Sequence, residues 1–220
     1  MEINDDKKQL LNLITESQKV ALCVPEKLST DTIAAASGLA SLLTDRGKEV
    51  SVLYCGNEEI VKEFNQYAKI QKSFGEYSLT VSLDYNNTPI EKVSYKAEDG
   101  VFKLTVTPIE KDFDLSKIGY DFTGPAYDLF IILGAQKLTN LGEIYTNNEE
   151  AFKKSPLINF DNNSANERYG TTNIVENTAP NLVSLVLAKM ATVGYFPSAN
   201  AIKAFLLGLS QNNSLTEAPL

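Results

Sequence analysis

The sequence predicts an α/β fold built on a doubly wound, mostly parallel sheet with helices on both faces, plus an inserted antiparallel β-meander. Short apolar runs typical of buried strands alternate with helical stretches along most of the chain, which is the signature of a parallel sheet. Between about residues 77 and 109, apolar residues alternate with polar ones instead, as in antiparallel strands with one solvated face. With 220 residues, 43% of them hydrophobic and 22% charged, the chain is long enough to bury a sizeable core.

Helix and strand signals alternate in the first part of the chain. Leu10 and Ile14 are spaced as the apolar face of a short helix. Ser29 or Thr30 can cap a second, alanine-rich helix, which Gly47 ends. The expected elements are a helix at 5–17, a strand at 20–24, a helix at 31–46, a strand at 50–55 and a helix at 58–67.

The second part of the chain begins with the inserted segment and then returns to the α/β pattern. The pairs Asn86-Asn87 and Asp99-Gly100 separate the alternating runs and are typical of tight hairpin turns. We therefore expect a single domain over residues 1–220 that carries an antiparallel insertion at about 77–109. The later elements are expected as a strand at 127–133, a helical stretch within 141–153, a strand at 157–161, and helices at 180–192 and 198–209.

The composition argues against several classes of function. A formal net charge of -8 argues against nucleic acid as a partner, because binding to the phosphate backbone needs clustered lysines and arginines. The chain contains no histidine, which is the usual general base near neutral pH and the commonest metal ligand. Any chemistry must therefore proceed without imidazole.

The ends and cysteines of the sequence indicate a cytoplasmic location. Residues Met1 to Asp6 are acidic and lack the basic and apolar stretches of a secretory signal. No run of about 18 uncharged apolar residues suits a membrane-spanning helix, so no membrane contact is expected. Cys23 and Cys55 lie in apolar, strand-like runs and are expected to be buried free thiols, as in a reducing compartment.

Four segments, in order and at suitable spacing, carry a family resemblance. Together they resemble the N-terminal domain of the DHH phosphoesterases of the oligoribonuclease and bisphosphate-nucleotide phosphatase type, over about residues 15–213. The resemblance implies a sheet whose strand ends hold two divalent cations, often manganese, which activate a water against a bound phosphate. The segments are Asp31–Leu39, Tyr127–Gly134, Leu157–Asn166 with the following Tyr169–Val175, and Leu207–Asn212.

The first two motifs of this family have lost most of their metal ligands in this chain. By the resemblance, the first histidine falls on Pro25 and the first aspartate on Ser29, while the second aspartate survives as Asp31. The aspartate of the second motif falls on Gly134. Asp31 is thus the only direct ligand that these motifs retain.

The later motifs are altered in the same direction. The Asp-His-His motif keeps Asp161, an outer partner in the family, but its histidines have become Asn162 and Asn163. The final aspartate falls on Asn212. Asparagine keeps hydrogen-bonding capacity without the repulsion between crowded carboxylates that metal ions would otherwise relieve. We expect a vestigial site with no catalytic residues and without the family's two manganese or magnesium ions.

Each of these features also has a purely structural interpretation. Asp31 could be a remnant ligand or a partner for a helix dipole. The residues from Asp161 to Asn163 could line a polar pocket or form a turn in which Asx side chains bond their own backbone. The insertion could present a sheet edge or face to a partner, or be an ornament without a binding role.

The expected function is a catalytically degenerate DHH phosphoesterase-like domain that acts as a binding or assembly module. Its partner would be an unknown protein or a second copy, and a nucleotide-like ligand could occupy the vestigial cleft at the carboxyl ends of the strands. The family's C-terminal substrate-binding domain is expected to be absent. Two alternatives stay open: a weak metal-dependent phosphoesterase acting on nucleotides or short oligonucleotides, and a purely structural subunit of a larger complex.

Overall fold

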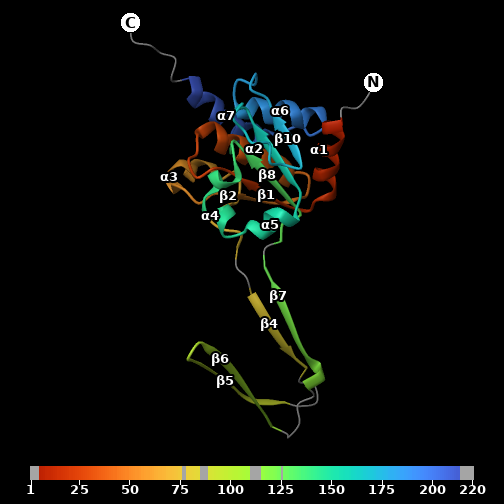
Figure 1. Ribbon diagram of the computed structural model, residues 1–220, viewed down its shortest axis with the longest axis vertical. Coiled ribbons are helices and arrows are strands. Elements are labelled where there is room, and N and C mark those ends of the chain that lie inside the picture. Colours follow the sequence, from red (N-terminus) through yellow and green to blue (C-terminus); the bar gives the residue numbers. More distant parts are fainter. Residues whose placement is uncertain (1–4, 76–77, 85–88, 110–114, 125, 214–220) are drawn as a thin grey trace. The chain divides into compact units, whose positions relative to one another are not determined.

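The computed structural model describes residues 5–75, 78–84, 89–109, 115–124 and 126–213 (Figure 1). The chain divides into two compact units. The first, which we call the sheet unit, comprises Met1–Gly75 and Ala126–Leu220; the second, the ribbon unit, comprises Glu76–Pro125. Within the described ranges, no helix is long and apolar enough to cross a membrane.

The sheet unit is built on a six-stranded sheet in which every neighbouring pair of strands is parallel. This confirms the predicted α/β fold. Strands β3 and β10 are shorter than the other four and were not predicted as separate elements. In spatial order the strands are β10 (Thr172–Val175), β9 (Leu157–Asp161), β8 (Leu129–Leu133), β1 (Lys19–Cys23), β2 (Glu49–Leu53) and β3 (Ile70–Gln71).

Helices cover both faces of this sheet because alternate residues of each strand enter different cores. In β8, Leu129 and Ile131 pack in the larger core with α1, α2, α6 and α7, whereas Phe130 and Ile132 pack in the smaller core with α4 and α5 (Figure 1). The helices are α1 (Asp5–Glu16), α2 (Thr30–Thr44), α3 (Glu58–Val61), α4 (Glu143–Thr146), α5 (Glu149–Lys154), α6 (Leu182–Thr192) and α7 (Ala199–Asn213), with 3-10 turns at Lys62–Phe64 and Leu138–Leu141.

The helix expected at 58–67 is shorter than predicted. Helix α3 ends at Val61 and the chain continues as a 3-10 turn to Phe64. Val61 and Phe64, three residues apart, are 4% and 2% exposed. Three-residue spacing places both side chains on one side of a 3-10 turn, so this geometry buries them together.

Small residues let α2 approach α7 closely. A Cβ atom added to Gly208 would lie 2.5 Å from the Cβ of Ala34, and one added to Gly38 would lie 2.5 Å from the ring of Phe205. Since Ala34 pairs with the later residue of α7 and Gly38 with the earlier one, the two helices run antiparallel. The C-terminal part of α7 is thereby directed toward the beginning of α2.

The ribbon unit consists of two antiparallel strand pairs. Strand β4 (Ser78–Leu83) pairs with β7 (Ile118–Thr123), and β5 (Ile90–Glu98) pairs with β6 (Val101–Pro108). Asp99 and Gly100 both have positive φ, 52° and 75°, as the predicted tight turn between β5 and β6 requires.

The predicted antiparallel insertion is confirmed, but its pairing is nested and extends beyond residue 109. Strand β7 was missed because Gly119 and Asp121 belong to residue types that strands generally disfavour. The other expected turn, at Asn86-Asn87, lies outside the described residues.

Candidate functional site

The strand order brings the predicted site segments to neighbouring strand ends. Strands β2 and β3 lie on one side of β1, whereas β8, β9 and β10 lie on the other. The order therefore changes direction between β1 and β8. Ligands of doubly wound sheets bind outside the carboxyl ends of the strands at such a point. The loops that follow β1, β8 and β9 carry Ser29, Gly134 and Asn162.

Asp31 lies in the first turn of α2, yet its carboxylate serves another helix. Its Oδ2 accepts a hydrogen bond of 2.8 Å from the backbone N–H of Leu182, and its Oδ1 accepts one of 3.2 Å from the N–H of Val183. These are the first two residues of α6. Ser29 caps α2 itself, since its hydroxyl accepts the N–H of Thr32. The carboxylate thus satisfies two N–H groups at a helix end that favours negative charge.

Gly134 follows β8 at a position where there is little room for a side chain. Its φ of 68° is in the left-handed region, and its N–H donates to the carbonyl of Phe160. An added Cβ would lie 3.0 Å from Oγ1 of Thr32 and 3.3 Å from Cδ2 of Leu182. Thr32 and Leu182 therefore occupy the space beside the strand end where the resemblance places an aspartate.

Asp161 ends β9 and is only 2% exposed. Its Oδ1 accepts the backbone N–H of Asn163 at 3.0 Å, which is the geometry of an Asx turn. Its Oδ2 accepts a hydrogen bond of 2.7 Å from Nδ2 of Asn166. The side chain of Asn163 repeats the turn geometry by accepting the N–H of Ala165.

A network of buried amides extends from Asp161 toward the edge of the sheet. Asn159 and Asn166 are 0% and 8% exposed, and Nδ2 of Asn159 donates to Oδ1 of Asn166 at 2.7 Å. Nδ2 of Asn159 also donates to Oδ1 of Asn173 on β10 at 3.0 Å. Nδ2 of Asn166 donates in addition to the carbonyl of Ala135, directly after Gly134. The network ties the loops after β8 and β9 to each other.

Tyr169 reinforces the same loop. Its hydroxyl donates a hydrogen bond of 2.6 Å to the carbonyl of Ala135. Burial of the phenol raises its pKa, and the nearby negative charge of Asp161 raises it further by a smaller amount. Tyr169 is therefore held as a neutral donor and is not placed to act as a base at neutral pH.

The sequence interpretation assigned no role to Asn159 or Asn166. A sequence feature that could have indicated such a role is Asn159 inside the apolar run Leu157–Asp161, because a buried side-chain amide must find hydrogen-bond partners. What the pattern did not show is that these partners lie on β10 and in the loop that begins at Asn162. Only the packing of β9 between β8 and β10 brings them together.

The remaining predicted positions have different surroundings. Pro25 is buried, and Asn162 donates weakly to the carbonyl of Ala179 at 3.4 Å, just before α6. Asn212 belongs to the last turn of α7, and its side chain lies outside the described part of the structure. The contacts thus gather Ser29, Asp31 and Gly134 around the beginning of α6, whereas Asp161 faces Asn163 and Asn166.

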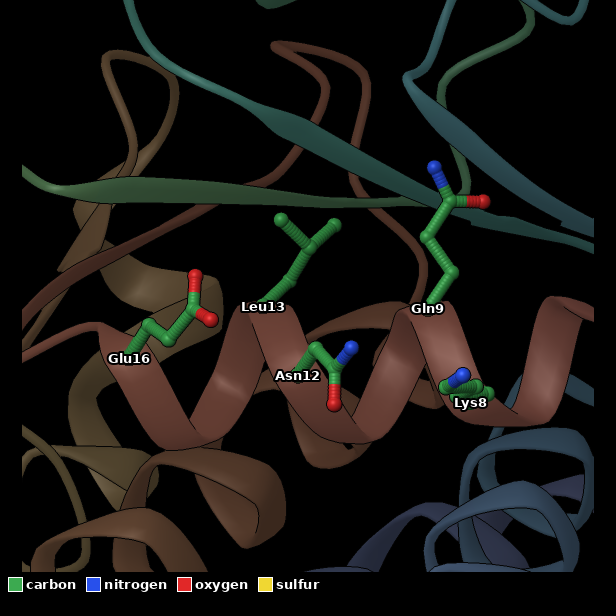
Figure 2. Close-up of a pocket in the computed structure, with 5 residues that line it drawn as sticks. All are labelled: Lys8, Gln9, Asn12, Leu13 and Glu16. Atoms are coloured by element: carbon green, nitrogen blue, oxygen red, sulfur yellow. The ribbon is translucent and has the colours of Figure 1, made fainter.

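Two surface hollows of the sheet unit lie elsewhere. One, of about 490 Å³, is lined by residues of α1, including Lys8, Leu13 and Glu16 (Figure 2). The other, of about 350 Å³, lies between α1, β10 and α6 and includes Arg168 and Lys189. Neither hollow is lined by a position of the predicted vestigial site.

Acidic and thiol groups do not cluster in the described ranges: no three carboxylate or thiol side chains there are arranged to hold a metal ion. Both cysteines are free, Cys23 buried and Cys55 half-buried. Burial raises the pKa of the Cys23 thiol, so it stays protonated and behaves as a small apolar residue. Cys55 donates to the carbonyl of Leu141 at 3.3 Å.

Comparison with known proteins finds similarity at the level of structure but not of sequence. No family model matches the chain, and no curated protein matches it. The chain is similar to the crystal structure of an exopolyphosphatase-related protein from Bacteroides fragilis, with a TM-score of 0.61 and 13% sequence identity. The match covers 95% of this chain and 50% of that protein, so the chain spans about half its length. Identity at this level shows a shared fold.

Proposed function

We propose that this chain is a catalytically degenerate DHH phosphoesterase-like domain that acts as a binding or assembly module. The observation that carries the proposal is that both carboxylate oxygens of Asp31 accept backbone N–H groups of α6. Asp31 is the one direct ligand that the family resemblance retains. These two N–H groups occupy part of the acceptor capacity of the carboxylate and compete with a cation for its oxygens.

The other ligand positions also fit two bridged cations poorly. Gly134 offers no ligating atom, and Thr32 and Leu182 lie where a side chain would extend. Asp161 is buried, and its two oxygens accept hydrogen bonds from Asn163 and Asn166. Two divalent cations a few ångströms apart need bridging oxygen ligands, which these positions do not supply.

A second candidate is a weak metal-dependent phosphoesterase acting on nucleotides or short oligonucleotides. The fold shared with an exopolyphosphatase-related protein is the observation that favours it. Such an activity would need ligands other than those that the resemblance carries over. A purely structural subunit, the remaining alternative, would likewise lack turnover but would take up no ligand at the strand ends.

Thermal unfolding with and without metal tests the proposal. An intact site with roughly micromolar affinity gains about 4 kcal/mol at a thousandfold excess of cation, equivalent to a rise on the order of 10 °C in Tm for a chain of this size. We expect millimolar manganese or magnesium to leave the circular dichroism melting curve of the sheet unit unchanged. The matched variants are Asp31→Asn and Asp45→Asn, at the two ends of α2.

Hydrolysis measured in the same buffers separates the candidates. We expect no turnover of a dinucleotide, a bisphosphate nucleotide or inorganic polyphosphate. A metal-induced shift that Asp31→Asn abolishes and Asp45→Asn preserves would contradict the degenerate reading, as would turnover with the same dependence. A shift induced by a nucleotide without metal would favour a binding module over a purely structural subunit.

A further inference from the structure

The ribbon unit carries most of the large apolar side chains that are exposed. Within the described ranges, 10 of the 15 exposed large hydrophobic residues belong to it. Monomeric soluble proteins rarely expose extended apolar patches, and larger ones mark interaction surfaces.

On the pair β5–β6, most of the apolar side chains share one face, whereas Val101, opposite Glu98, lies on the other. Tyr95 lies directly opposite Leu104, and Ala97 lies opposite Phe102. Tyr95 and Phe102 are 75% and 65% exposed, and their rings stack with centroids 5.8 Å apart. Because side chains alternate between the faces of a strand, the lysines of this pair lie on the opposite face. They are Lys92, Lys96 and Lys103.

The pair β4–β7 repeats this arrangement. Val81 lies opposite Tyr120 and Leu83 lies opposite Ile118, while Thr80 and its partner Asp121 are on the other face. Tyr120 is 82% exposed. We call the exposed large apolar residues on these two faces the apolar ribbon faces, and they are Leu79, Val81, Val93, Tyr95, Phe102, Leu104, Ile118 and Tyr120.

Neither ribbon is expected to be stable with its apolar face in water. A two-stranded antiparallel pair is at best marginally stable by itself and needs a third strand or an apolar partner. In the described ranges, each strand of the ribbon unit pairs with one other strand only. Covering the apolar ribbon faces would supply the missing burial.

We infer that a second copy of this chain covers the apolar ribbon faces. The inference names the partner for the assembly role proposed above and rests on that proposal. Aromatic side chains bury about 150–250 Å² each when covered, so eight side chains more than two-fifths exposed present on the order of 800 Å². A stable interface takes about 800 Å² from each partner, so a second copy that covers both faces would bury enough surface for a stable dimer.

The charge distribution also favours a second copy. The chain has a net charge of -8, so two copies repel each other through most of their surfaces. The paired residues on these faces, from Val93 opposite Val106 to Ala97 opposite Phe102 and from Leu79 to Leu83 with their partners, include no lysine, arginine, aspartate or glutamate, so two such faces can meet there without bringing like charges together. A different protein would ordinarily be selected by complementary charge, which these faces do not offer. Symmetric self-pairing places the same face of each copy against the other.

Two double variants at directly opposed residues test this inference in the full chain. Tyr95→Glu with Leu104→Glu introduces two carboxylates on the apolar face of β5–β6. Ser94→Glu with Thr105→Glu introduces two at the adjacent pair on its polar face. By light scattering after gel filtration at about 50 µM, within the affinity range of such interfaces, we expect wild type and the Ser94/Thr105 variant to be dimers. The Tyr95/Leu104 variant should be a monomer whose sheet unit melts as in wild type.

Cysteine crosslinking keeps the test valid if that variant loses its ribbon structure. In a Cys55→Ser background, Ala97→Cys adds a thiol to the apolar face and Thr105→Cys adds one to the polar face of the same ribbon. Cys23 is buried and does not react. On mild oxidation we expect disulfide-linked dimers with Ala97→Cys, at least tenfold more than with Thr105→Cys.

Three results would overturn the inference. They are a wild-type chain that is monomeric at this concentration, a dimer that both double variants leave intact, and crosslinking that does not depend on the face. Phosphoesterase assays on the same samples keep this outcome separate from the proposed function. A protein that is monomeric and inactive would contradict only the proposed self-association. A protein that is dimeric and hydrolyses phosphoesters would contradict only the proposed catalytic degeneracy.

Discussion

Asp31 accepts a hydrogen bond of 2.8 Å from the backbone N–H of Leu182, which joins the first turn of α2 to the first residue of α6 across 151 residues of sequence. The carboxylate that the family resemblance identifies as the surviving metal ligand is thus also a cap for a helix far away in the chain. This contact gives Asp31 a structural role that needs no metal ion, because loss of the carboxylate would leave two N–H groups at a helix end without this acceptor.

Replacement of Asp31 should therefore destabilise the protein. We expect Asp31→Ala to lower the free energy of unfolding by about 1–3 kcal/mol, since two partly buried N–H groups lose a charged acceptor. Asp31→Asn should cost less, because one amide oxygen remains. Urea unfolding followed by circular dichroism measures both, with Asp45→Ala at the exposed end of α2 as the control. Equal stability of Asp31→Ala and wild type would show that the cap has no energetic role.

Gly134 should tolerate a side chain less well than a glycine with the same backbone and open surroundings. Gly47 has φ of 81° and nothing within 4 Å of an added Cβ, so Gly47→Ala isolates the cost of the left-handed backbone, about 1–2 kcal/mol. Gly134→Ala adds the close contacts with Thr32 and Leu182, for a total of about 2–4 kcal/mol. Melting temperatures of the two variants make the comparison. A smaller decrease in Tm for Gly134→Ala than for Gly47→Ala would mean that the Thr32 side chain moves aside easily. An aspartate would then fit at position 134.

The buried amide network predicts a pH-dependent defect. Asn166→Asp would place a second carboxyl group 2.7 Å from Oδ2 of Asp161, where two negative charges repel strongly. The pKa of the introduced carboxyl should rise above its unfolded value of about 3.9, so the folded state holds the proton over a wider pH range. The variant should thus approach wild-type stability near pH 4 and lose stability as the pH rises. Exposed Asn163→Asp serves as the control, and equal melting profiles for the two variants from pH 4 to 8 would refute the prediction.

Asp128 predicts the opposite pH dependence for the wild-type chain. Its Oδ2 accepts the backbone N–H groups of Lys19 and Gln18 at 2.7 and 2.9 Å, and these bonds lower the pKa of the carboxyl. A depressed pKa contributes stability that is fully present above the unfolded value of about 3.9 and is lost as the pH falls through the folded pKa. Asp128→Asn should flatten the stability profile below about pH 4, and Asp45→Asn should not. Parallel acid profiles for all three proteins would exclude this contribution.

Introducing histidines at positions 162 and 163 should not by itself produce activity. In Asn162→His with Asn163→His, Gly134 still lacks a ligating atom and Asp31 still caps α6. Two cations need bridging oxygen ligands as well as imidazoles, so we expect neither a manganese-dependent rise in Tm nor turnover of a bisphosphate nucleotide. Metal-dependent hydrolysis by this double variant would show that histidines at these two positions are enough to complete a working site.

Much of the fold was predictable because its signals are local. The apolar run Leu157–Asp161 and the alanine-rich segment of α2 each fix one element by periodicity, and their alternation indicates a parallel sheet. The short strands β3 and β10 carry too few residues for a pattern. They form because the neighbouring strands β9 and β2 supply their hydrogen-bond partners. The spacing of residues along the chain does not show which strand will lie next to them.

The sequence by itself determined which groups are present at the strand ends: an aspartate at residue 31, no histidine anywhere, and proline, serine, glycine or asparagine at the other positions where the resemblance places direct ligands. Only the tertiary structure decided what these groups do. It brings Leu182 and Val183 to Asp31, fills the space beside Gly134, and surrounds Asp161 with amide donors. Composition and periodicity act along the chain, whereas hydrogen bonds between α2 and α6 depend on contacts that only packing creates.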